Sequence, residues 1–223
     1  MQCITPLLAL ILIALSFSGC RSEVEPETTP AAQQATGQVT QQTKSLIPTQ
    51  QTSNDYHRVP MGEPAPLFDL INQDNQPITM ESLKGKAVLL TFIYTHCPDI
   101  CPATLNKFQI IASQLNPKER EQLAIVSITL DPERDSAEHL REYGRFFSGG
   151  DKGWYFLTGE RSKLEQIWQA YEIQYTTAPN GNIIHPSMVV LIDKQGIEQI
   201  DYHGVATPTD IIVTDLKQIL AEK

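Results

Sequence analysis

The stretch KAVLLTFIYTHCPDICP, residues 86–102, decides the fold. Its first part, residues 86–94, is a nearly continuous run of apolar and β-branched side chains, which is typical of a strand buried on both faces. A proline-marked helix start follows at once, and Cys97 and Cys101 lie between the strand and the helix. Because sites form at the strand ends of α/β sheets, we expect the functional site here.

On either side of this stretch, the same kinds of pattern predict the other elements. A second buried strand is expected at residues 123–130, and two strands joined by a glycine-ended turn are expected at residues 187–192 and 197–202. Helices are expected at residues 98–115, 136–147, 161–171 and 208–222, the last with Thr207 as its N-cap. This order predicts an α/β fold with a central mixed sheet flanked by helices and a C-terminal β-hairpin and helix.

Composition and charge limit the possible functions. The chain has 223 residues, of which 41% are apolar, as in a globular protein. It carries 17 Lys and Arg against 26 Asp and Glu, which gives a net charge of −9, and it contains no run of basic residues. This charge argues against a nucleic acid partner, because neutralising phosphates requires clustered cations.

The N-terminal segment predicts export. Its first 19 residues carry no charge, and the apolar run at residues 7–17 is too short, at about 1.5 Å per residue, to cross a hydrocarbon layer of ~30 Å. The run ends in Phe17-Ser18-Gly19-Cys20, which resembles the lipobox where bacterial lipoproteins are cleaved and acylated. We expect a lipoprotein-type signal peptide at residues 1–19, a lipidated Cys20, and a membrane-anchored protein facing the periplasm or the extracellular side.

A tether is expected to follow the anchor. Residues 21–55 contain no aromatic side chain and are rich in Gln and Thr. Such a segment cannot bury enough apolar surface to offset its ordering entropy. We therefore expect residues 20–55 to form the lipidated, flexible tether and residues 56–223 to form one globular domain.

Only two cysteines remain after this processing, because Cys3 leaves with the signal peptide and Cys20 carries the lipid. Cys97 and Cys101 are helix neighbours, with Cβ atoms about 5 to 6 Å apart, so they could form a redox-active disulfide pair or bind a metal ion. The alternative is a pair of buried, inert cysteines. A position at a helix N-terminus is expected to lower the pKa of Cys97, and Cys101 is expected to be the more buried of the two.

A histidine could complete a metal site, since two thiolates and one imidazole suit copper in either oxidation state. His185 follows a loop of turn formers, residues 176–182, and immediately precedes a predicted strand, so it could reach the cysteines. Its position alone leaves open whether it is a ligand or a surface histidine. His57, His139 and His203 are less well placed.

Three features together resemble the Sco (SenC) family of copper-binding, thioredoxin-fold proteins. They are YTHCPDICP at residues 94–102, TLDPERD at residues 129–135, and His185 before an apolar strand. The resemblance covers residues 60–220. It implies a thioredoxin-like fold, copper held by Cys97, Cys101 and His185, and a role in building the dinuclear copper centre of cytochrome c oxidase.

The resemblance also singles out two further positions. Asp131 matches an acidic position near the copper site, where it would support the ligands or bind weakly; a turn role in Asp131-Pro132 is the alternative. Pro186, directly after His185, departs from the family pattern.

Two function classes follow. In the first, the protein is a membrane-tethered metallochaperone, not necessarily an enzyme, that receives copper from an upstream donor and passes it to the apo copper-centre subunit of cytochrome c oxidase. In the second, it is a thiol-disulfide reductase that keeps the oxidase cysteines reduced, with Cys97 as nucleophile, Cys101 as resolving thiol and an upstream thiol reductant. His185 discriminates between the two classes, because dithiol exchange does not require it.

Overall fold

The computed structural model describes residues 58–222. The expected signal peptide at residues 1–19 and the lipidated tether at residues 20–55 lie outside the described residues, as do the first two residues and the last residue of the expected domain. None of the helices within the described range combines the length and the hydrophobicity needed to cross a membrane.

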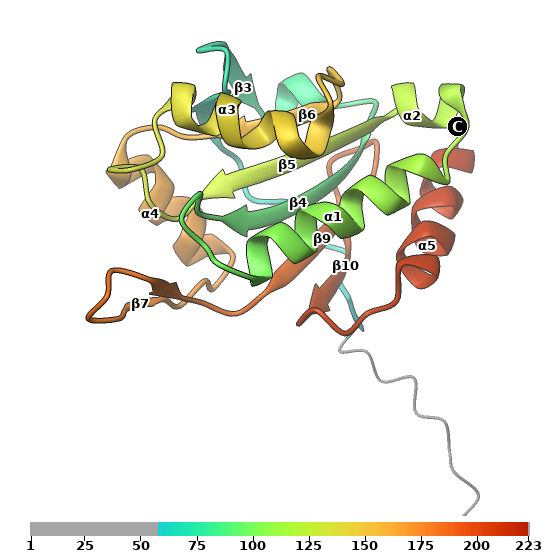
Figure 1. The fold of residues 1–223 in the computed structure, drawn as a ribbon. Helices are drawn as coiled ribbons and strands as arrows, with labels where there is room; N and C mark the ends of the chain where they lie inside the picture. Colours follow the sequence, from blue (N-terminus) through green and yellow to red (C-terminus); the bar gives the residue numbers. More distant parts are fainter. Residues whose placement is uncertain (1–57, 223) are drawn as a thin grey trace, which may run out of the picture. The chain divides into compact units, whose positions relative to one another are not determined.

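A six-stranded mixed sheet forms the centre of this domain (Figure 1). Its middle strands, β4 (Ala87–Ile93) and β5 (Leu123–Thr129), pair in parallel, and every residue of both is buried. Their sequences are nearly continuous apolar or β-branched runs because both faces of the sheet are covered. The strand order is β1-β10-β9-β4-β5-β6. Strand β6 (Trp154–Leu157) pairs in parallel with β5. The other three pairings are antiparallel: β9 (Met188–Ile192) with β4, β10 (Glu198–His203) with β9, and β1 (Arg58–Pro60) with β10.

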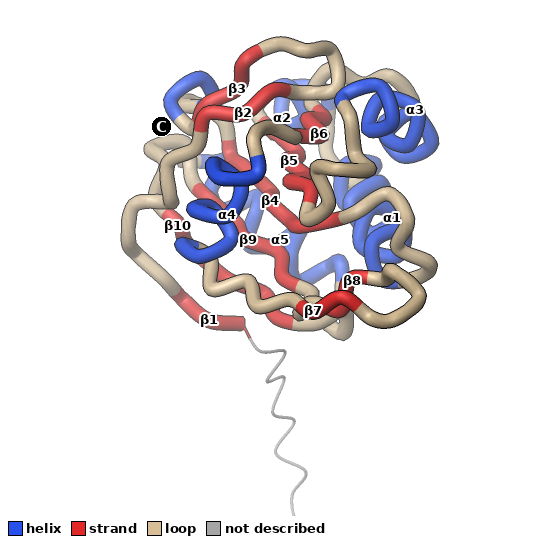
Figure 2. Tube along the Cα trace, turned by 90° about the vertical axis from the view of Figure 1, so that its left-hand side faces the viewer, coloured by secondary structure: helices blue, strands red, loops and turns tan. Residues whose placement is uncertain are grey.

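Helices cover both faces of this sheet (Figure 2). On one face α1 (Ile100–Ser113) packs against α3 (Ala137–Ser148) and α5 (Thr209–Ala221), and on the other lies α4 (Arg161–Ala170). A short helix, α2 (Pro117–Glu121), and a 3-10 turn, η1 (Glu81–Leu83), complete the helical elements of the described range. The predicted α/β fold with a mixed sheet, a β9–β10 hairpin and a C-terminal helix is confirmed.

Two helices begin later than predicted. α1 begins at Ile100 because Asp99 is its N-cap, with a carboxylate that accepts a hydrogen bond from the backbone N–H of Ile100. Pro208, not Thr207, is the N-cap of α5. The backbone of Pro208 is extended, and the preceding Thr207 carbonyl accepts a hydrogen bond from Lys107 Nζ of α1 at 2.6 Å.

The sequence patterns do not predict the shortest elements. Strand β6 has four residues, and two small antiparallel pairs have strands of two or three residues. These pairs are β2 (Asp69–Ile71) with β3 (Pro77–Thr79), and β7 (Thr176–Thr177) with β8 (Ile183–Ile184). The turn formers expected as a loop at residues 176–182 are therefore the turn and first strand of a hairpin.

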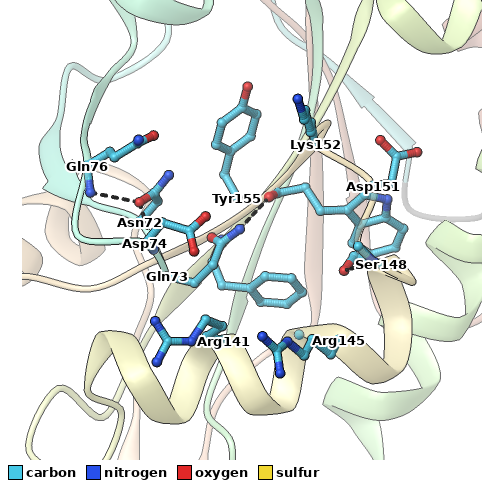
Figure 3. Close-up of a pocket in the computed structure, with 14 residues that line it drawn as sticks. Asn72, Gln73, Asp74, Gln76, Arg141, Arg145, Ser148, Asp151, Lys152 and Tyr155 are labelled. Carbon is cyan, nitrogen blue, oxygen red and sulfur yellow. Dashed lines mark hydrogen bonds between the residues drawn. The ribbon is translucent and has the colours of Figure 1, made fainter.

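The β2–β3 turn covers the outer edge of β6 (Figure 3). The Gln73 side chain donates to the Trp154 carbonyl at 3.0 Å and accepts from the Phe156 backbone N–H at 2.9 Å. A cavity of about 570 Å³ lies beside Gln73, and Arg141, Arg145 and Lys152 are among its lining residues. None of the predicted site residues lines this cavity.

Candidate functional site

Cys97 and Cys101 meet at the turn between β4 and α1. The backbone N–H of Cys97 donates to the Tyr94 carbonyl at 3.1 Å, which turns the chain directly after the buried strand. Cys101 lies in the first turn of α1, and its backbone N–H donates to Cys97 Sγ at 3.3 Å. The sulfur of Cys97 therefore satisfies one of the N–H groups that a helix start leaves without an intrahelical partner. Neither cysteine forms a disulfide.

The two cysteines differ in exposure and in pKa. Cys97 is 8% exposed and Cys101 is 1% exposed, which confirms that Cys101 is the more buried. The pKa of Cys97 is lowered to about 5, mainly because the Cys101 thiol donates a hydrogen bond to the Cys97 sulfur. The backbone N–H groups of Cys101 and Asp99 lower this pKa further, whereas burial opposes the shift. The same hydrogen bond, together with burial, raises the pKa of Cys101. Cys97 is thus a thiolate at neutral pH, and Cys101 is a thiol.

Tyr94 links the two cysteines to the segment that carries His185. Its side chain is buried, and burial together with the negative charge on Cys97 raises the pKa of Tyr94 to about 12. The neutral hydroxyl donates a hydrogen bond to the Cys97 sulfur, which also helps to lower the pKa of Cys97. The Tyr94 ring meets the His185 imidazole edge to face, with ring centroids 6.3 Å apart.

His185 follows β8 at the end of the small hairpin. Its Nδ1 lies 2.9 Å from the Pro186 carbonyl. Because a carbonyl only accepts, Nδ1 carries the proton in this bond, and Nε2 keeps a free lone pair. Burial lowers the pKa of His185, so the imidazole is neutral at physiological pH. The main-chain carbonyl of Pro186 therefore fixes the tautomer, and any residue at this position would carry that acceptor.

The two thiols and the imidazole are neighbours, but they do not form a closed set of ligands. Within residues 58–222, no group of three or more His, Cys, Asp or Glu side chains is arranged to hold a metal ion. The charge of Cys97 nevertheless acts on the pKa of His185, and Tyr94 contacts both side chains. Simultaneous binding by all three would require the β7–β8 hairpin to bring the imidazole closer to the sulfurs.

Asp135, which the sequence analysis does not single out, joins the ends of the two central strands. It is fully buried, and it accepts hydrogen bonds from the backbone N–H and hydroxyl of Thr95 and, at 2.6 Å, from the hydroxyl of Thr129. Burial raises the pKa of Asp135, and its charge contributes to the raised pKa of Cys101. In the sequence, the feature that could have pointed to Asp135 is its place at the end of the TLDPERD motif, residues 129–135.

Asp131 contacts Arg134. The Arg134 Nε donates to an Asp131 carboxylate oxygen, and its Nη2 donates to the Gly181 carbonyl at 2.8 Å. Gly181 lies in the turn between β7 and β8. The carboxylate of Asp131 therefore orients Arg134, which holds the hairpin before His185. The backbone carbonyl of Asp131 accepts hydrogen bonds from the backbone N–H groups of Arg134 and Asp135, which forms a turn.

The other candidate histidines lie elsewhere. His139 is on α3, and its Nδ1 contacts the Arg134 carbonyl at 2.7 Å. His203 ends β10 and is exposed. His57 lies outside the described residues.

A thiolate and a buried thiol at the first turn of a helix, directly after a central strand, define a thioredoxin-like dithiol protein, here with an imidazole beside the dithiol. The SCO1/SenC family model matches residues 61–221. The chain therefore belongs to the SCO1/SenC family, and the resemblance seen in the sequence is confirmed.

Three solved structures illustrate this similarity. Copper-bound ScoI of Bradyrhizobium japonicum has 26% sequence identity and a TM-score of 0.62, with 71% of this chain and 99% of that chain covered. A SCO1/SenC family lipoprotein from Bacillus anthracis str. Ames has 26% identity and a TM-score of 0.65, with coverages of 72% and 96%. BsSco, described as having a disulfide switch and as belonging to the Sco family of cytochrome c oxidase assembly proteins, has 29% identity and a TM-score of 0.63, with coverages of 74% and 97%.

Proposed function

We propose that this protein binds copper through Cys97, Cys101 and His185 and takes part in cytochrome c oxidase assembly by delivering that copper. The similarity to a copper-bound ScoI supports the metal, and the similarity to BsSco supports the assembly role. In this proposal copper is the cargo, and the recipient is the apo copper-centre subunit of the oxidase.

The observation that carries the proposal is the set of donor atoms at the β4–α1 turn. The sulfur of Cys97, just before α1, lies beside that of Cys101 in the first turn of the helix, and the first sulfur is already ionised. A neutral imidazole with a free Nε2 lies beside the tyrosine that contacts the Cys97 sulfur. Thiolates suit Cu(I), and added nitrogen suits Cu(II). The donor set therefore fits copper in both oxidation states.

The chain's own residues set the order of loading and release. Cys97 offers a thiolate at neutral pH, whereas Cys101 must release its proton to solvent before its sulfur can bind. His185 offers its nitrogen without losing a proton. Because Cys101 is the more buried sulfur, ligands of a recipient subunit reach the copper first from the side of Cys97 and His185.

The difference in pKa between the two cysteines favours a second function, thiol-disulfide reduction. The Cys97 thiolate would attack one sulfur of a disulfide in the oxidase subunit, forming a mixed disulfide and releasing the other sulfur as a thiol. Cys101, after losing its proton, would then attack Cys97, which releases the reduced subunit and leaves a Cys97–Cys101 disulfide. An upstream thiol reductant would have to reduce that disulfide before the next cycle.

A lipid anchor completes the proposed organisation. We infer that the mature protein begins at a lipidated Cys20, that residues 20–55 are a tether, and that residues 56–223 form the working domain outside the cytoplasm. The lipobox-like sequence and the similarity to a Bacillus anthracis lipoprotein support this. Cys20→Ser should release the protein from membranes or block its processing; an unchanged membrane fraction and mass would contradict the anchor.

One substitution separates the two functions. His185→Ala should weaken Cu(II) binding about 100-fold, abolish the thiolate-to-Cu(II) charge-transfer band, and leave Cu(I) binding and disulfide formation nearly unchanged. His139→Ala, on the exposed part of α3, is the matched control and should change none of these. In cells, His185→Ala should lower oxidase assembly if copper delivery is the function. Normal assembly with normal disulfide exchange would support the reductase instead.

A further inference from the structure

A pair of buried acids lies away from the two cysteines, near the β1 edge of the sheet. Glu198 and Asp201 of β10 are 5% and 8% exposed. Both line a cavity of about 470 Å³ between β1, β9, β10 and the end of α4. Strand residues three apart ordinarily face opposite sides of a sheet. The register of β10 shifts between Glu198 and Ile200, and the two carboxyl groups consequently reach the same cavity.

No lysine or arginine of the described chain lines this cavity to neutralise the two acids. Its other titratable lining groups are Tyr171 and Glu172 at the end of α4 and His203 at the end of β10, and the remaining lining residues are apolar. Burial raises the pKa of Asp201, whereas the hydrogen bond with Glu198 and the charge of His203 act in the opposite direction. Two adjacent buried carboxyl groups do not both ionise readily, so at neutral pH Glu198 keeps its proton beside an ionised Asp201.

The hydrogen bonding of the pair requires the same proton. Oδ1 of Asp201 is buried and has no partner among the N–H groups and hydroxyls of the described residues. The Tyr171 hydroxyl also has no partner, so it is not the donor. Because a carboxylate only accepts, Glu198 must be protonated to donate to Asp201. Burial and this hydrogen bond raise the pKa of Glu198 to about 8.

One wall of the cavity is a strap of chain, residues 58–63, that lies along the outer side of β10. Its first three residues form β1 and pair with β10, and further on the Glu198 N–H donates to the Glu63 carbonyl at 2.9 Å. Val59 and Met61 are the strap residues that line the cavity, and they are 42% and 44% exposed. Backbone hydrogen bonds therefore hold the strap with little buried apolar surface, which is typical of a segment that opens locally.

We propose that the acid pair makes this strap a pH-sensitive clasp. The shared proton keeps residues 58–63 closed against β10, and loss of the proton to solvent opens them. With both carboxylates ionised, the closed cavity would hold two like charges away from water, which is unfavourable. Opening of the strap admits water to both groups and breaks only the strap's own hydrogen bonds, whereas β9, whose residues are all buried, stays in the sheet. With the proposed lipid anchor, on which this consequence rests, an open strap lengthens the tether by about 20 Å, at about 3.3 Å per residue.

The direction of the pH dependence follows from the two states of Glu198. Its pKa is about 8 while the strap is closed, and it falls toward the ordinary value of about 4.3 when water enters. Opening therefore releases a proton, so the stabilisation of the closed strap is complete below about pH 4.3 and is lost as the pH rises through about 8. The open fraction should rise about tenfold from pH 6 to pH 7 and become constant above about pH 8.

Hydrogen exchange in the full-length protein tests the clasp. The amides of Met61 and Glu198 bond across the strap and β10, and their protection factors should fall about tenfold from pH 6 to pH 7 and stay constant above about pH 8. Protection factors already correct for the intrinsic effect of pH on exchange. The Ile71 amide, which donates to the Thr158 carbonyl beyond β6, is the internal control, and its protection should change less than about twofold.

Glu198→Gln separates the acid pair from other causes of a pH dependence. The amide still donates to Asp201 but cannot ionise, so the strap should stay protected, with no change between pH 6 and pH 8. Glu172→Gln and His203→Gln are the matched controls, because both residues line the same cavity, and both variants should keep the wild-type pH dependence.

Asp201→Asn guards against a Glu198→Gln variant that fails to fold. It removes the neighbouring charge, so the pH above which protection is constant should fall below 8. Wild-type protection of the strap that does not change between pH 6 and pH 8, or a pH dependence that persists in Glu198→Gln, would overturn the proposal, as would an unchanged pH profile in Asp201→Asn. Copper binding by Glu198→Gln should remain normal, so failure of the clasp would not affect the proposed function.

Discussion

The cysteine half and the histidine half of the candidate copper site are held in different ways. Cys97 lies between a strand whose seven residues are all buried and a helix of 14 residues, and Cys101 lies in the first turn of that helix. His185 follows a hairpin whose strands have two residues each, with Thr176, Thr177 and Ile184 exposed. Figure 1 shows this hairpin, labelled β7, extending away from the central sheet.

The cysteine half is preformed, whereas the histidine half is attached by few contacts. Asp135 fixes the strand end before Cys97, and α1 fixes Cys101. The hairpin depends on the Arg134 bond to Gly181 and on the contact of Tyr94 with His185. In the proposed copper site, the metal would stay on the two sulfurs while the imidazole approaches or withdraws.

The largest effect is expected in the cysteine half of the candidate copper site. Cys101→Ala removes the thiol that contributes most to lowering the pKa of Cys97, so this pKa should rise from about 5 toward the ordinary cysteine value of about 8.5. Cys101→Ser keeps a hydroxyl donor and should give a smaller rise. The pH dependence of thiolate absorbance and of the iodoacetamide reaction rate measures both. An unchanged Cys97 pKa in Cys101→Ala would show that the helix N-terminus alone ionises Cys97.

Asp135→Asn should destabilise the strand ends that hold the cysteine half. The amide replaces one acceptor oxygen by a donor that faces the donors of Thr95 and Thr129, so unfolding free energy should fall by about 2 to 3 kcal/mol in urea denaturation. Asp131→Asn is the control, because it weakens only a partly exposed ion pair, and its cost should be about 0.5 kcal/mol. Equal losses for the two variants would contradict the framing role of Asp135.

The pH dependence of the same denaturation carries a signature of Asp135. Burial raises its pKa in the folded state above the value of about 3.9 expected in the unfolded chain. Its contribution to stability is therefore complete below the unfolded value and is lost as the pH rises through the folded value. Asp135→Asn should remove this part of the pH dependence.

Arg134→Gln should act on the histidine half alone. It removes the ion pair with Asp131 and weakens the bond to the Gly181 carbonyl, so Cu(II) affinity should fall by roughly tenfold, the low end for residues that orient a ligand. The pKa of Cys97 should not change. Arg134→Lys, which keeps the charge, should recover part of the affinity. A change in the Cys97 pKa would mean that the two halves are not held separately.

The smallest effect concerns motion in the wild type. Copper binding should slow amide hydrogen exchange at residues 176–185, because the imidazole is then held against the sulfurs. Exchange in α1 beyond its first turn should change little, since that helix is already packed. Unchanged exchange in the hairpin on addition of Cu(II) would contradict binding by His185.

The elements predicted well from the sequence are those whose side chains face one kind of surroundings throughout. β4 and β5 are buried on both faces, and their runs were recognisable without any tertiary information. Strand β6 was not, because its four residues are too few to show a period. The start of α1 was misplaced by two residues: it was expected at Pro98, whereas Asp99 is the N-cap and the helix begins at Ile100.

The residues of the candidate site also differ in how well the sequence predicts them. Cys97 and Cys101 are close in sequence and meet at the start of α1, but Cys97 lies before the helix, so the expected spacing of helix neighbours does not describe the pair. His185 could be tied to them only through the family resemblance, because 84 residues separate it from Cys101 and its approach depends on a hairpin that the sequence does not reveal. The roles of Asp135 and Arg134 depend on which strand ends and turns come together in space.

The Gln73 side chain at β6 has a consequence for how the molecule behaves among its own copies. An outer strand of a sheet exposes alternating N–H and carbonyl groups, which can pair with a strand of another molecule and begin aggregation. Here the Trp154 carbonyl and the Phe156 N–H are both bonded to one glutamine amide, which imitates a neighbouring peptide unit (Figure 3). Gln73 thereby occupies these two groups, which a foreign strand would need, and the protein can reach a high local concentration without this edge joining molecule to molecule.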